Sequence, residues 1–345
     1  MRALTISAHG GTEKIEYRTD VPVPEPSAGT VRVRLHAAAL NHLDVFTLGG
    51  LPGINIQPPW VMGADGAGVI DKVGGGVTTV TEGTRVAINP GLSDRTCEYC
   101  RAGEQSLCVK FRLLGEHAPG TFADYVVVPA ENVRSIPENI SFETAAAATL
   151  ANLTAWRMLV TRAKVSANDD VLIWGIGGGV AQAAMRIAKM HRARVWVTSG
   201  SDEKLERAKA LGADEVINHR TTPVGKEVRS RTGKRGLSVV IDSIGHDTWN
   251  ESLIALGRAG RLVTCGGTSG AMVETDVRRL FWNQWTIMGS TMGNDTEFEA
   301  VTNELSRGRL LPVIDSTFQL SEGRKAFERM ADGKQFGKIV LRIAE

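Results

Sequence analysis

The sequence has few cysteines, no long apolar run and no excess of charge of one sign. Cysteine occurs 4 times in 345 residues, which excludes the dense disulfide framework of a small secreted scaffold. No apolar run reaches the roughly 18 residues that a membrane-spanning helix needs. The N-terminal segment, Met1 to Thr5, becomes polar too soon for a signal peptide. We therefore expect a cytoplasmic protein.

The charged residues nearly balance, with 40 Lys and Arg against 38 Asp and Glu. The densest basic stretch, Arg229 to Arg235, is short and is interrupted by Gly233. A protein that binds nucleic acid or an anionic membrane usually carries a continuous basic stripe. We expect neither partner, and a small-molecule substrate instead.

Hydrophobic residues make up 42% of the chain and charged residues 23%, as in ordinary soluble proteins. The length predicts about two domains. Residues 1–130 are rich in Gly, Pro and β-branched residues, and Val31 to Leu35 alternates like a half-buried strand. Residues 275–345 predict one or two helices and a last strand, Lys338 to Leu341, which returns to complete the first domain.

The stretch 131–274 alternates between strand and helix patterns. Val171 to Trp174 is a continuous apolar run, typical of a strand that is buried on both faces. Val180 to Ala188 carries an apolar helical face, and a second helix is predicted over Asp202 to Leu211. Further strands are predicted at Arg194–Thr198, Glu215–Ile217, Ser238–Asp242 and Arg261–Thr264. This pattern predicts an α/β fold with a doubly wound parallel sheet.

A glycine-rich loop joins the first of these strands to the first helix. Glycines at such a turn let the backbone approach a pyrophosphate, and the helix N-terminus favours its negative charge. The strand before the loop and the amphipathic helix after it make a structural turn the weaker interpretation. The predicted dinucleotide contacts are Gly175, Gly177, Gly178, Gly179 and Val180.

The residues after the second strand favour NADPH over NADH. NADH-binding proteins place Asp or Glu there to accept from the ribose 2′-hydroxyl. Here the chain reads Ser199-Gly200-Ser201, with Lys204 just beyond. Hydroxyl groups and a cation can bind a 2′-phosphate. The competing interpretation is that Lys204 is an ordinary surface charge of the helix.

Three of the four cysteines lie close together, in the pattern Asp94-x2-Cys97-x2-Cys100-x7-Cys108. Zinc accepts thiolate and carboxylate ligands in a tetrahedral arrangement. The spacing allows one loop to wrap around one ion, and we expect a structural zinc ion held by Asp94, Cys97, Cys100 and Cys108.

Several segments together resemble the medium-chain dehydrogenase/reductase superfamily, in particular its zinc-type alcohol dehydrogenase-like and quinone oxidoreductase-like branch. The segments are Leu40–Asp44, Gly63–Ile70, Asn89–Gly91, Gly120–Tyr125, Leu153–Trp156, the glycine loop and Phe336–Val340. The resemblance implies a GroES-like catalytic domain from residues 1–130 and 275–345 and a Rossmann NADP(H)-binding domain from residues 131–274. It also implies a structural-zinc lobe at about residues 90–110, in which Asp94 replaces the first of four cysteines.

The resemblance also shows what the active site has lost. Zinc-dependent members hold a catalytic metal with an early Cys, a His-Glu pair, and a Cys or acidic residue before the second domain. The matching positions here are Asn41, Ala64-Asp65 and Leu150. Only Asp65 could coordinate, whereas a catalytic zinc needs three protein ligands. We predict no catalytic zinc, and we interpret Asp65 as a buried, hydrogen-bonded acid.

Without a metal, hydride delivery to an electron-poor acceptor is easier than alcohol oxidation. A quinone, an α,β-unsaturated carbonyl or an enoyl thioester needs only hydrogen-bond donors and good placement against the nicotinamide. The resemblance implies Asn41, Asp44 and Thr154 as catalytic residues, with an internal hydrogen-bonding role as the alternative for Asp44. For cofactor binding it implies His42, His219, Gly266 and Lys338 in addition to the glycine loop, Ser199, Ser201 and Lys204, with an ordinary surface-loop role as the alternative for His219.

Three functions therefore remain open. The first is an NADPH-dependent reductase of electron-poor acceptors. The second is an alcohol or carbonyl oxidoreductase, and the third is a largely non-catalytic NADPH-binding protein. The resemblance further implies a homodimer or homotetramer, in which the sheet edge at Trp285 to Met288 could pair across a two-fold axis.

Overall fold

The computed structural model describes residues 1–51 and 53–344. The chain forms two compact units, Met1–Leu153 with Gly293–Glu345, and Thr154–Met292. Both boundaries fall later in the sequence than the expected 130/131 and 274/275. Residues 131–153 stay with the first unit because β10 (Val133–Ser135) pairs with β6 (Arg85–Ile88) and α3 (Phe142–Ala147) packs on its sheet.

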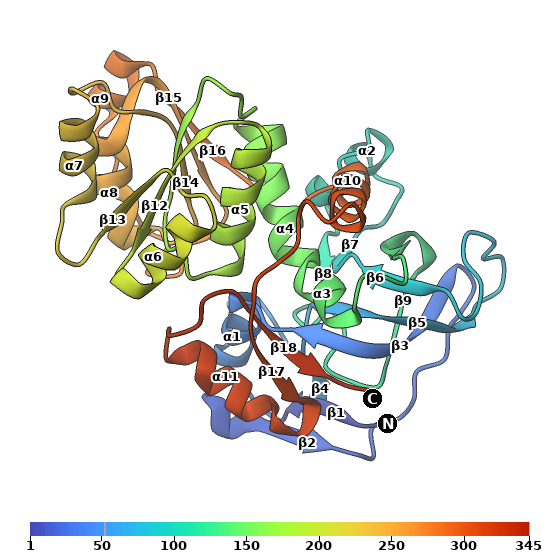
Figure 1. Cartoon of the computed structure of the whole chain (residues 1–345). Helices are drawn as coiled ribbons and strands as arrows, with labels where there is room; N and C mark the ends of the chain where they lie inside the picture. The colour runs from blue at the N-terminus through green and yellow to red at the C-terminus, as the bar shows by residue number, and fades with distance from the viewer. Residues whose placement is uncertain (52, 345) are drawn as a thin grey trace. The chain divides into compact units, whose positions relative to one another are not determined.

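The first unit is built on a seven-stranded sheet whose centre is β3 (Thr30–Ala39). The main path runs β10, β6, β5 (Asp65–Val73), β3, β18 (Lys338–Arg342) and β17 (Ile314–Gln319), and β9 (Tyr125–Pro129) also pairs with β3. β18 lies antiparallel to β3, which confirms that the tail returns to the first domain (Figure 1). A smaller sheet holds β2 (Ile15–Arg18), β1 (Ala3–Ile6) and β4 (Trp60–Val61).

The alternation in β3 shows why this segment is a strand. Val31, Val33 and Leu35 are fully buried, whereas Arg32 and Arg34 are not, as a period of two requires. Helices complete the unit: α1 (His42–Gly49), α3, the start of α4 (Thr149–Trp156), α10 (Asp295–Ser306) and α11 (Gly323–Ala331). Short segments β7 (Gly91–Leu92), α2 (Glu98–Arg101) and β8 (Arg112–Leu113) form the cysteine lobe and its base.

The second unit is a doubly wound parallel sheet, as the sequence predicts. Its six strands run in the order β13 (Glu215–Asn218), β12 (Arg194–Ser199), β11 (Asp170–Ile173), β14 (Leu237–Asp242), β15 (Leu256–Thr264) and β16 (Thr286–Gly289). Every pair is parallel. The helices of this unit are α5 (Gly179–Met190), α6 (Asp202–Ala210), α7 (Val224–Arg231), α8 (His246–Ala255) and α9 (Val277–Asn283).

The segment 275–345 differs from its prediction in two respects. It holds three helices in the described chain, α9, α10 and α11, rather than one or two. Its first part, up to Met292, belongs to the second unit. The physical reason is β16, which extends the parallel sheet because Arg261 to Thr264 of β15 pair with Thr286 to Gly289.

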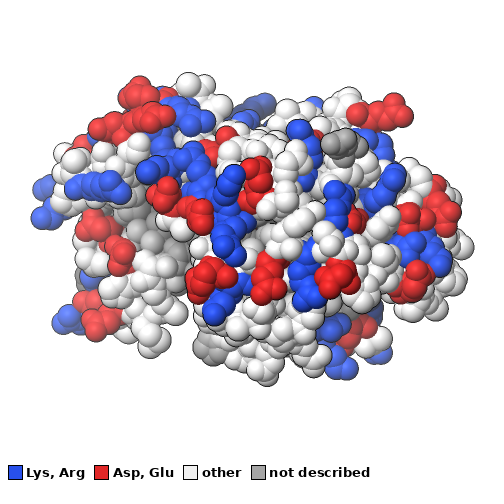
Figure 2. All heavy atoms as spheres, turned by 90° about the horizontal axis from the view of Figure 1, so that it is seen from below, with Lys and Arg blue, Asp and Glu red and all other residues white. Residues whose placement is uncertain are grey.

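The charged side chains on the surface are mixed, as the balanced composition of the sequence suggests. On the face shown in Figure 2, basic and acidic side chains are interspersed. Among the described residues no helix combines the length and the apolar character that crossing a membrane requires.

Candidate functional site

A buried polar cluster occupies the first unit at the predicted active-site positions. Asp65 begins β5 and is 0% exposed, and Lys338 begins β18 and is 4% exposed. The Lys338 Nζ atom lies 2.8 Å from Asp65 Oδ2 and 2.6 Å from Asn41 Oδ1. The Asn41 amide nitrogen donates to the same Asp65 oxygen over 2.9 Å. The three side chains thus form a closed triangle. Thr149 and Leu150 also bind Asp65, and we call all five residues the Asp65 cluster.

The second oxygen of Asp65 caps the start of α4. It accepts hydrogen bonds from the Thr149 hydroxyl and, over 2.7 Å, from the Leu150 backbone nitrogen. A carboxylate at a helix N-terminus is favoured because the first N–H groups have no partner within the helix. Asp65 is therefore buried and fully hydrogen-bonded, as the sequence indicates. It joins the starts of β5, β18 and α4 to the residue that precedes α1.

The residues of this cluster do not fit a catalytic zinc ion. Lys338 Nζ also donates to the Leu40 carbonyl oxygen over 2.7 Å, so all three ammonium hydrogens are used. The cation already sits against Asp65, the one possible ligand, and Ala64 and Leu150 offer no ligand side chain. Zinc needs three protein ligands even in an open site, and we derive no chemical step through a metal here.

Asp44 lies next to the cluster, in the first turn of α1. Its Oδ2 atom accepts from the Asn41 backbone nitrogen over 2.7 Å, and the residue is 2% exposed. Burial raises the pKa of Asp44 to about 7, against a smaller opposing effect of the Asn41 hydrogen bond. A carboxyl with this pKa can hold or release a proton near neutrality. His42, which begins the same helix, is exposed.

Glu116 is a buried acid that the sequence analysis missed. It is 8% exposed and lies in the loop between β8 and β9, next to Gly115. Burial raises the pKa of its carboxyl. It carries no periodic or spacing signal, because a single Glu in a polar loop looks like any surface acid.

In the second unit, the glycine loop has the geometry of a phosphate-binding turn. Gly175 has φ +67°, a conformation that favours glycine. Gly178 is the N-cap of α5, and Gly179 is its first residue. The loop is fixed to β12, because the Ile176 nitrogen donates to the Thr198 carbonyl oxygen over 2.9 Å. A twelve-residue helix thus begins at the carboxyl end of β11, where a dinucleotide pyrophosphate fits.

Other predicted cofactor residues gather at the same carboxyl ends of the parallel strands. Ser199 ends β12, and its hydroxyl accepts from the Ser201 nitrogen over 3.1 Å. The Ser201 hydroxyl caps α6, because it accepts from the Lys204 nitrogen over 3.4 Å. His219 follows β13, and its backbone nitrogen donates to the Ser199 carbonyl oxygen over 3.1 Å. Gly266 follows β15 and is exposed.

Arg220 is a second residue that the sequence analysis missed. A Cβ atom added at Gly200 would lie 2.6 Å from Arg220 Nε, so the arginine side chain lies directly over the glycine. Within the described chain, the Arg220 guanidinium has no acidic partner. Only the glycine at position 200 signals this approach, and sequence alone does not say which side chain fills the space.

Thr154 and Lys338 need separate comment. Thr154 is the first residue of the second unit, and its hydroxyl lies 3.7 Å from the Met292 sulfur. Asn41, Asp44 and Lys338 belong to the first unit. Lys338 was expected to bind cofactor, but its ammonium is saturated by Asp65, Asn41 and Leu40, and its cofactor role stays a prediction.

The cysteine lobe brings the four expected ligands together. The ligand atoms of Asp94, Cys97, Cys100 and Cys108 all lie within 4.8 Å of one another. In residues 1–51 and 53–344 this is the one group of three or more His, Cys, Asp or Glu side chains so arranged. Backbone N–H groups of Cys97 and Thr96 lower the pKa of Asp94. The carboxyl therefore stays ionised, which is the form that binds a metal ion. Three sulfurs and one carboxylate suit zinc, so the residues fit a structural ion.

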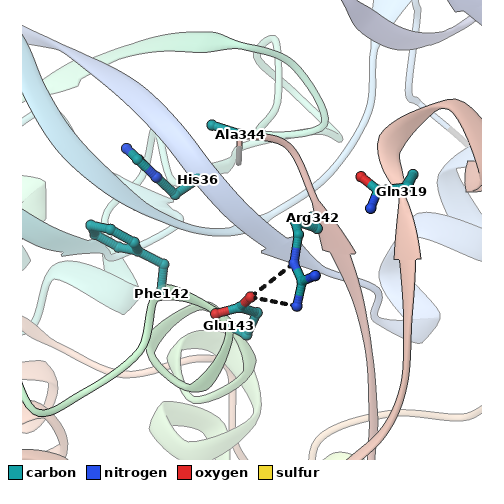
Figure 3. A pocket seen from close by; sticks show the side chains of 6 residues that line it. All are labelled: His36, Phe142, Glu143, Gln319, Arg342 and Ala344. Carbon is teal, nitrogen blue, oxygen red and sulfur yellow. Dashed lines mark hydrogen bonds and ion pairs between the residues drawn. The ribbon is translucent and has the colours of Figure 1, made fainter.

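A separate pocket lies in the first unit, beside α3 and the end of β18. It has a volume of about 360 Å³, and it includes none of the predicted site residues. In Figure 3, Glu143 from α3 points toward Arg342 from β18. This ion pair measures 3.0 Å, and the rings of His36 and Phe142 stack with their centroids 4.3 Å apart. The remaining lining residues are Gln319 and Ala344.

Comparison with known proteins agrees with this architecture. The family model of the alcohol dehydrogenase GroES-like domain matches residues 27–138, and that of the zinc-binding dehydrogenase matches residues 179–307. The chain is 30% identical to an NAD-dependent alcohol dehydrogenase of Sulfurisphaera tokodaii over 99% of both chains. It is 28% identical to a quinone oxidoreductase of Homo sapiens over 99% of this chain and 97% of the other. A crystal structure of an NAD-dependent alcohol dehydrogenase superposes with a TM-score of 0.95, at 44% identity over 100% of both chains.

The fold and the matched models define an oxidoreductase with a GroES-like and a Rossmann-like part. The chain belongs to the medium-chain dehydrogenase/reductase superfamily, in the branch of alcohol dehydrogenase-like and quinone oxidoreductase-like proteins. This family implies a nicotinamide cofactor, and the glycine loop at the start of α5 fits one.

Proposed function

We propose that the protein is an NADPH-dependent reductase that delivers hydride to an electron-poor acceptor without a catalytic metal. The acceptor class is a quinone, an α,β-unsaturated carbonyl or an enoyl thioester. The observation that carries the proposal is the Asp65 cluster, in which Lys338 and Asn41 are bound to the only possible ligand side chain at the family's metal positions. Alcohol oxidation loses its alkoxide stabilisation without a metal, whereas reduction of these acceptors does not require one.

The bound nicotinamide supplies the hydride, and the chain supplies binding, orientation and protons. Asn41 is the proposed donor to the acceptor oxygen. One N–H of its amide is held by Asp65 over 2.9 Å, whereas the other makes only a long bond of 3.4 Å to the Ala39 carbonyl oxygen. A bond of that length is weak, so this second N–H is the one that a substrate oxygen can accept from while the Asp65 and Lys338 bonds of the amide stay in place. Asp44 orients Asn41 through the backbone, and Thr154 is the proposed contact to the nicotinamide.

The proposed preference for NADPH rests on the groups around the end of β12. No carboxylate stands at Ser199, and Arg220 lies over Gly200 with its guanidinium free of acidic partners in the described chain. The nearest acid along the chain, Asp202, accepts from the Asn218 side chain over 2.7 Å. Two of the relatives reported above are named as NAD-dependent, which counts against a preference for NADPH. An arginine beside the ribose is the usual partner of a 2′-phosphate.

Replacing Arg220 tests the cofactor preference. R220A is expected to raise KM for NADPH by roughly 10- to 100-fold, the loss of one charge-assisted hydrogen bond, and to leave KM for NADH unchanged. R194A is the matched control, because Arg194 begins the strand that Ser199 ends. Equal KM values for the two cofactors in the unmodified protein would reject the preference.

The reaction class is tested by following NADPH oxidation with a small enone, its saturated ketone and a quinone at one enzyme concentration. Turnover of the enone or quinone, but not the ketone, supports the metal-free reductase. Ketone reduction that survives a strong chelator would instead favour the alcohol or carbonyl oxidoreductase. Tight NADPH binding without turnover of any acceptor would favour the non-catalytic alternative.

We further propose that the protein is a homodimer through the second unit. β16 is an edge strand in this sheet. Close to it in the chain, α9 exposes three large apolar side chains: Val277 is 63% exposed, Phe281 64% and Trp282 68%. An open strand and an exposed apolar helix face can both be covered by a second copy across a two-fold axis.

A further inference from the structure

The loop between β8 and β9, which carries Glu116, packs on the segment that leads into the metal-free site. Gly115 has φ +78°, and a Cβ atom there would lie 2.6 Å from the Gly63 carbonyl oxygen. A Cβ atom at Gly120 would lie 2.2 Å from the same oxygen. The loop backbone therefore rests directly on Gly63, which precedes Ala64 and Asp65 in the chain. Only glycine at positions 115 and 120 permits this approach.

Hydrogen bonds fix the loop in this place. The Trp60 indole nitrogen donates to the Gly115 carbonyl oxygen over 2.8 Å. Within the loop, the Gly115 nitrogen donates to the Ala118 carbonyl oxygen over 2.7 Å, and the His117 nitrogen to that of Leu113 over 2.9 Å. Glu116 lies between these anchored residues, so its backbone position is set by the fold.

The Glu116 carboxyl lacks the partners that other buried acids in the protein have. Asp65 accepts four hydrogen bonds from side chains and backbone, and Asp242 accepts from two backbone nitrogens and two hydroxyls. Glu116 is 8% exposed, and the one polar partner found for its carboxyl among the described residues is His117, at 3.8 Å, which is beyond hydrogen-bonding distance. A buried carboxylate without donors is costly, so the neutral acid is favoured.

Two titratable groups face this carboxyl. The His117 Nδ1 atom lies 3.8 Å from Glu116 Oε2, and the His117 side chain is 36% exposed. Burial is the main cause that raises the pKa of Asp44 in α1, and the carboxylates of Asp65 and Glu116 add to it when they are ionised. Asp44 is the less accessible of the two acids, because it is 2% exposed against 8% for Glu116.

We propose that Glu116 is the catalytic acid, which gives its proton to the acceptor after hydride transfer. The inference rests on the proposed reductase function. Addition of the hydride to the β-carbon of an enone breaks the C=C π bond and leaves an enolate. The Glu116 O–H bond then breaks, its proton forms the new C–H bond at the α-carbon, and the carboxylate remains. With a quinone, the proton goes to the oxygen. Water next to His117 restores the acid, so each turnover uses one NADPH and one proton.

Replacing Glu116 tests the proposal with an α-substituted enone in heavy water. E116Q is expected to lower kcat by roughly 10²- to 10⁴-fold, the range for losing a general acid, with the Kd for NADPH unchanged. Unmodified protein is expected to place deuterium on one face of the α-carbon, and E116Q on both faces. E116D keeps an acid and should recover part of the rate and the selectivity. E131Q, at an exposed glutamate, is the control and should change neither.

Infrared difference spectroscopy without substrate gives an independent measurement. The protonated carboxyl band of the protein at pH 7 should lose a component in E116Q that remains in D44N. Failure of the reductase function would appear as an unmodified protein that reduces neither enone nor quinone. Failure of this inference would appear differently, as an active E116Q with unchanged one-face deuteration, or as the absence of a Glu116 carboxyl band.

Discussion

Asp65 holds together the polar interior of the first unit. Its partner Lys338 is only 5% exposed in its side chain, and the two residues are 273 positions apart in the chain. A buried ion pair contributes little by itself, but removing one partner leaves an uncompensated charge. We expect D65N to destabilise the protein by about 3–5 kcal/mol in urea unfolding.

The double variant D65N/K338M separates the charge effect from the loss of packing. It removes both charges, so its destabilisation should be smaller than that of D65N alone. Equal destabilisation of the single and the double variant would show that the pairing with Lys338 is not what makes Asp65 important.

Asp44 makes stability depend on pH in the opposite sense to a salt-bridged acid. Its pKa is about 7 in the folded protein against an ordinary value of 3.8, so the folded state binds the extra proton. Stability from this group is full below about pH 4 and is lost as the pH rises to about 7, by up to about 4 kcal/mol. D44N should flatten the pH dependence of urea unfolding between pH 5 and 7.5.

The control for this measurement is E131Q, which should keep the slope of the unmodified protein. Glu116 acts in the same direction as Asp44 because burial raises its pKa too. E116Q should therefore flatten the same curve in part. A D44N variant with an unchanged slope would contradict the assigned pKa.

Sequence reasoning at the scale of single residues succeeded where a residue stood in a motif. Asn41 and Asp65 were placed at one site because both occupy the family's metal positions. It missed Glu116 and Arg220, because both positions depend on close approaches that only glycine allows. Gly115 and Gly120 let the Glu116 loop rest on the Gly63 backbone, and Gly200 leaves room for the Arg220 side chain. Such approaches depend on tertiary packing and have no local pattern.

At the scale of elements, the cysteine lobe gives a prediction about metal content. We expect one zinc ion per chain by mass spectrometry, held by Asp94 and the three neighbouring cysteines. Removing it with a strong chelator should lower the melting temperature, because a structural zinc contributes directly to folding. D94C should retain zinc against higher chelator concentrations.

Cys265 provides the matched control for the lobe, because it is the one cysteine outside the ligand group. C265S should keep one zinc ion, whereas C100S should lose it. The lobe is tied to α10 by the Arg95–Asp295 pair, so zinc loss should also increase amide exchange at the start of α10. A zinc-free protein from zinc-supplemented cells would refute the assignment.

Periodicity predicted the regular elements well and the irregular ones poorly. The apolar run at Val171 and the helical face from Val180 appear as β11 and α5. Both patterns are clear because the apolar side chains that form them are buried in the core. The helix α9 was not anticipated, since Phe281 and Trp282 point to solvent and show no amphipathic match to the core. The later domain boundaries likewise depend on pairing between strands distant in sequence.

At the scale of the whole molecule, the exposed face of α9 predicts association. W282E should shift the protein from dimer to monomer at micromolar concentration in analytical ultracentrifugation, because large aromatic residues dominate interface energies. L107E introduces the same charge at another exposed apolar residue, in the cysteine lobe, and should leave the mass unchanged. A monomeric unmodified protein would reject this surface as an interface.

The position of β18 has a consequence for the order in which the newly made chain matures. The first unit is interrupted by the whole second unit and is closed only by its final strand, which lies between β3 and β17. During synthesis the second unit is complete when Met292 has left the ribosome, whereas the partner of Asp65, Lys338, emerges only later. Until then an acid meant for the interior has no cation. Nascent chains that stop short of residue 338 should therefore carry a folded nucleotide-binding unit beside an unfinished, protease-sensitive partner.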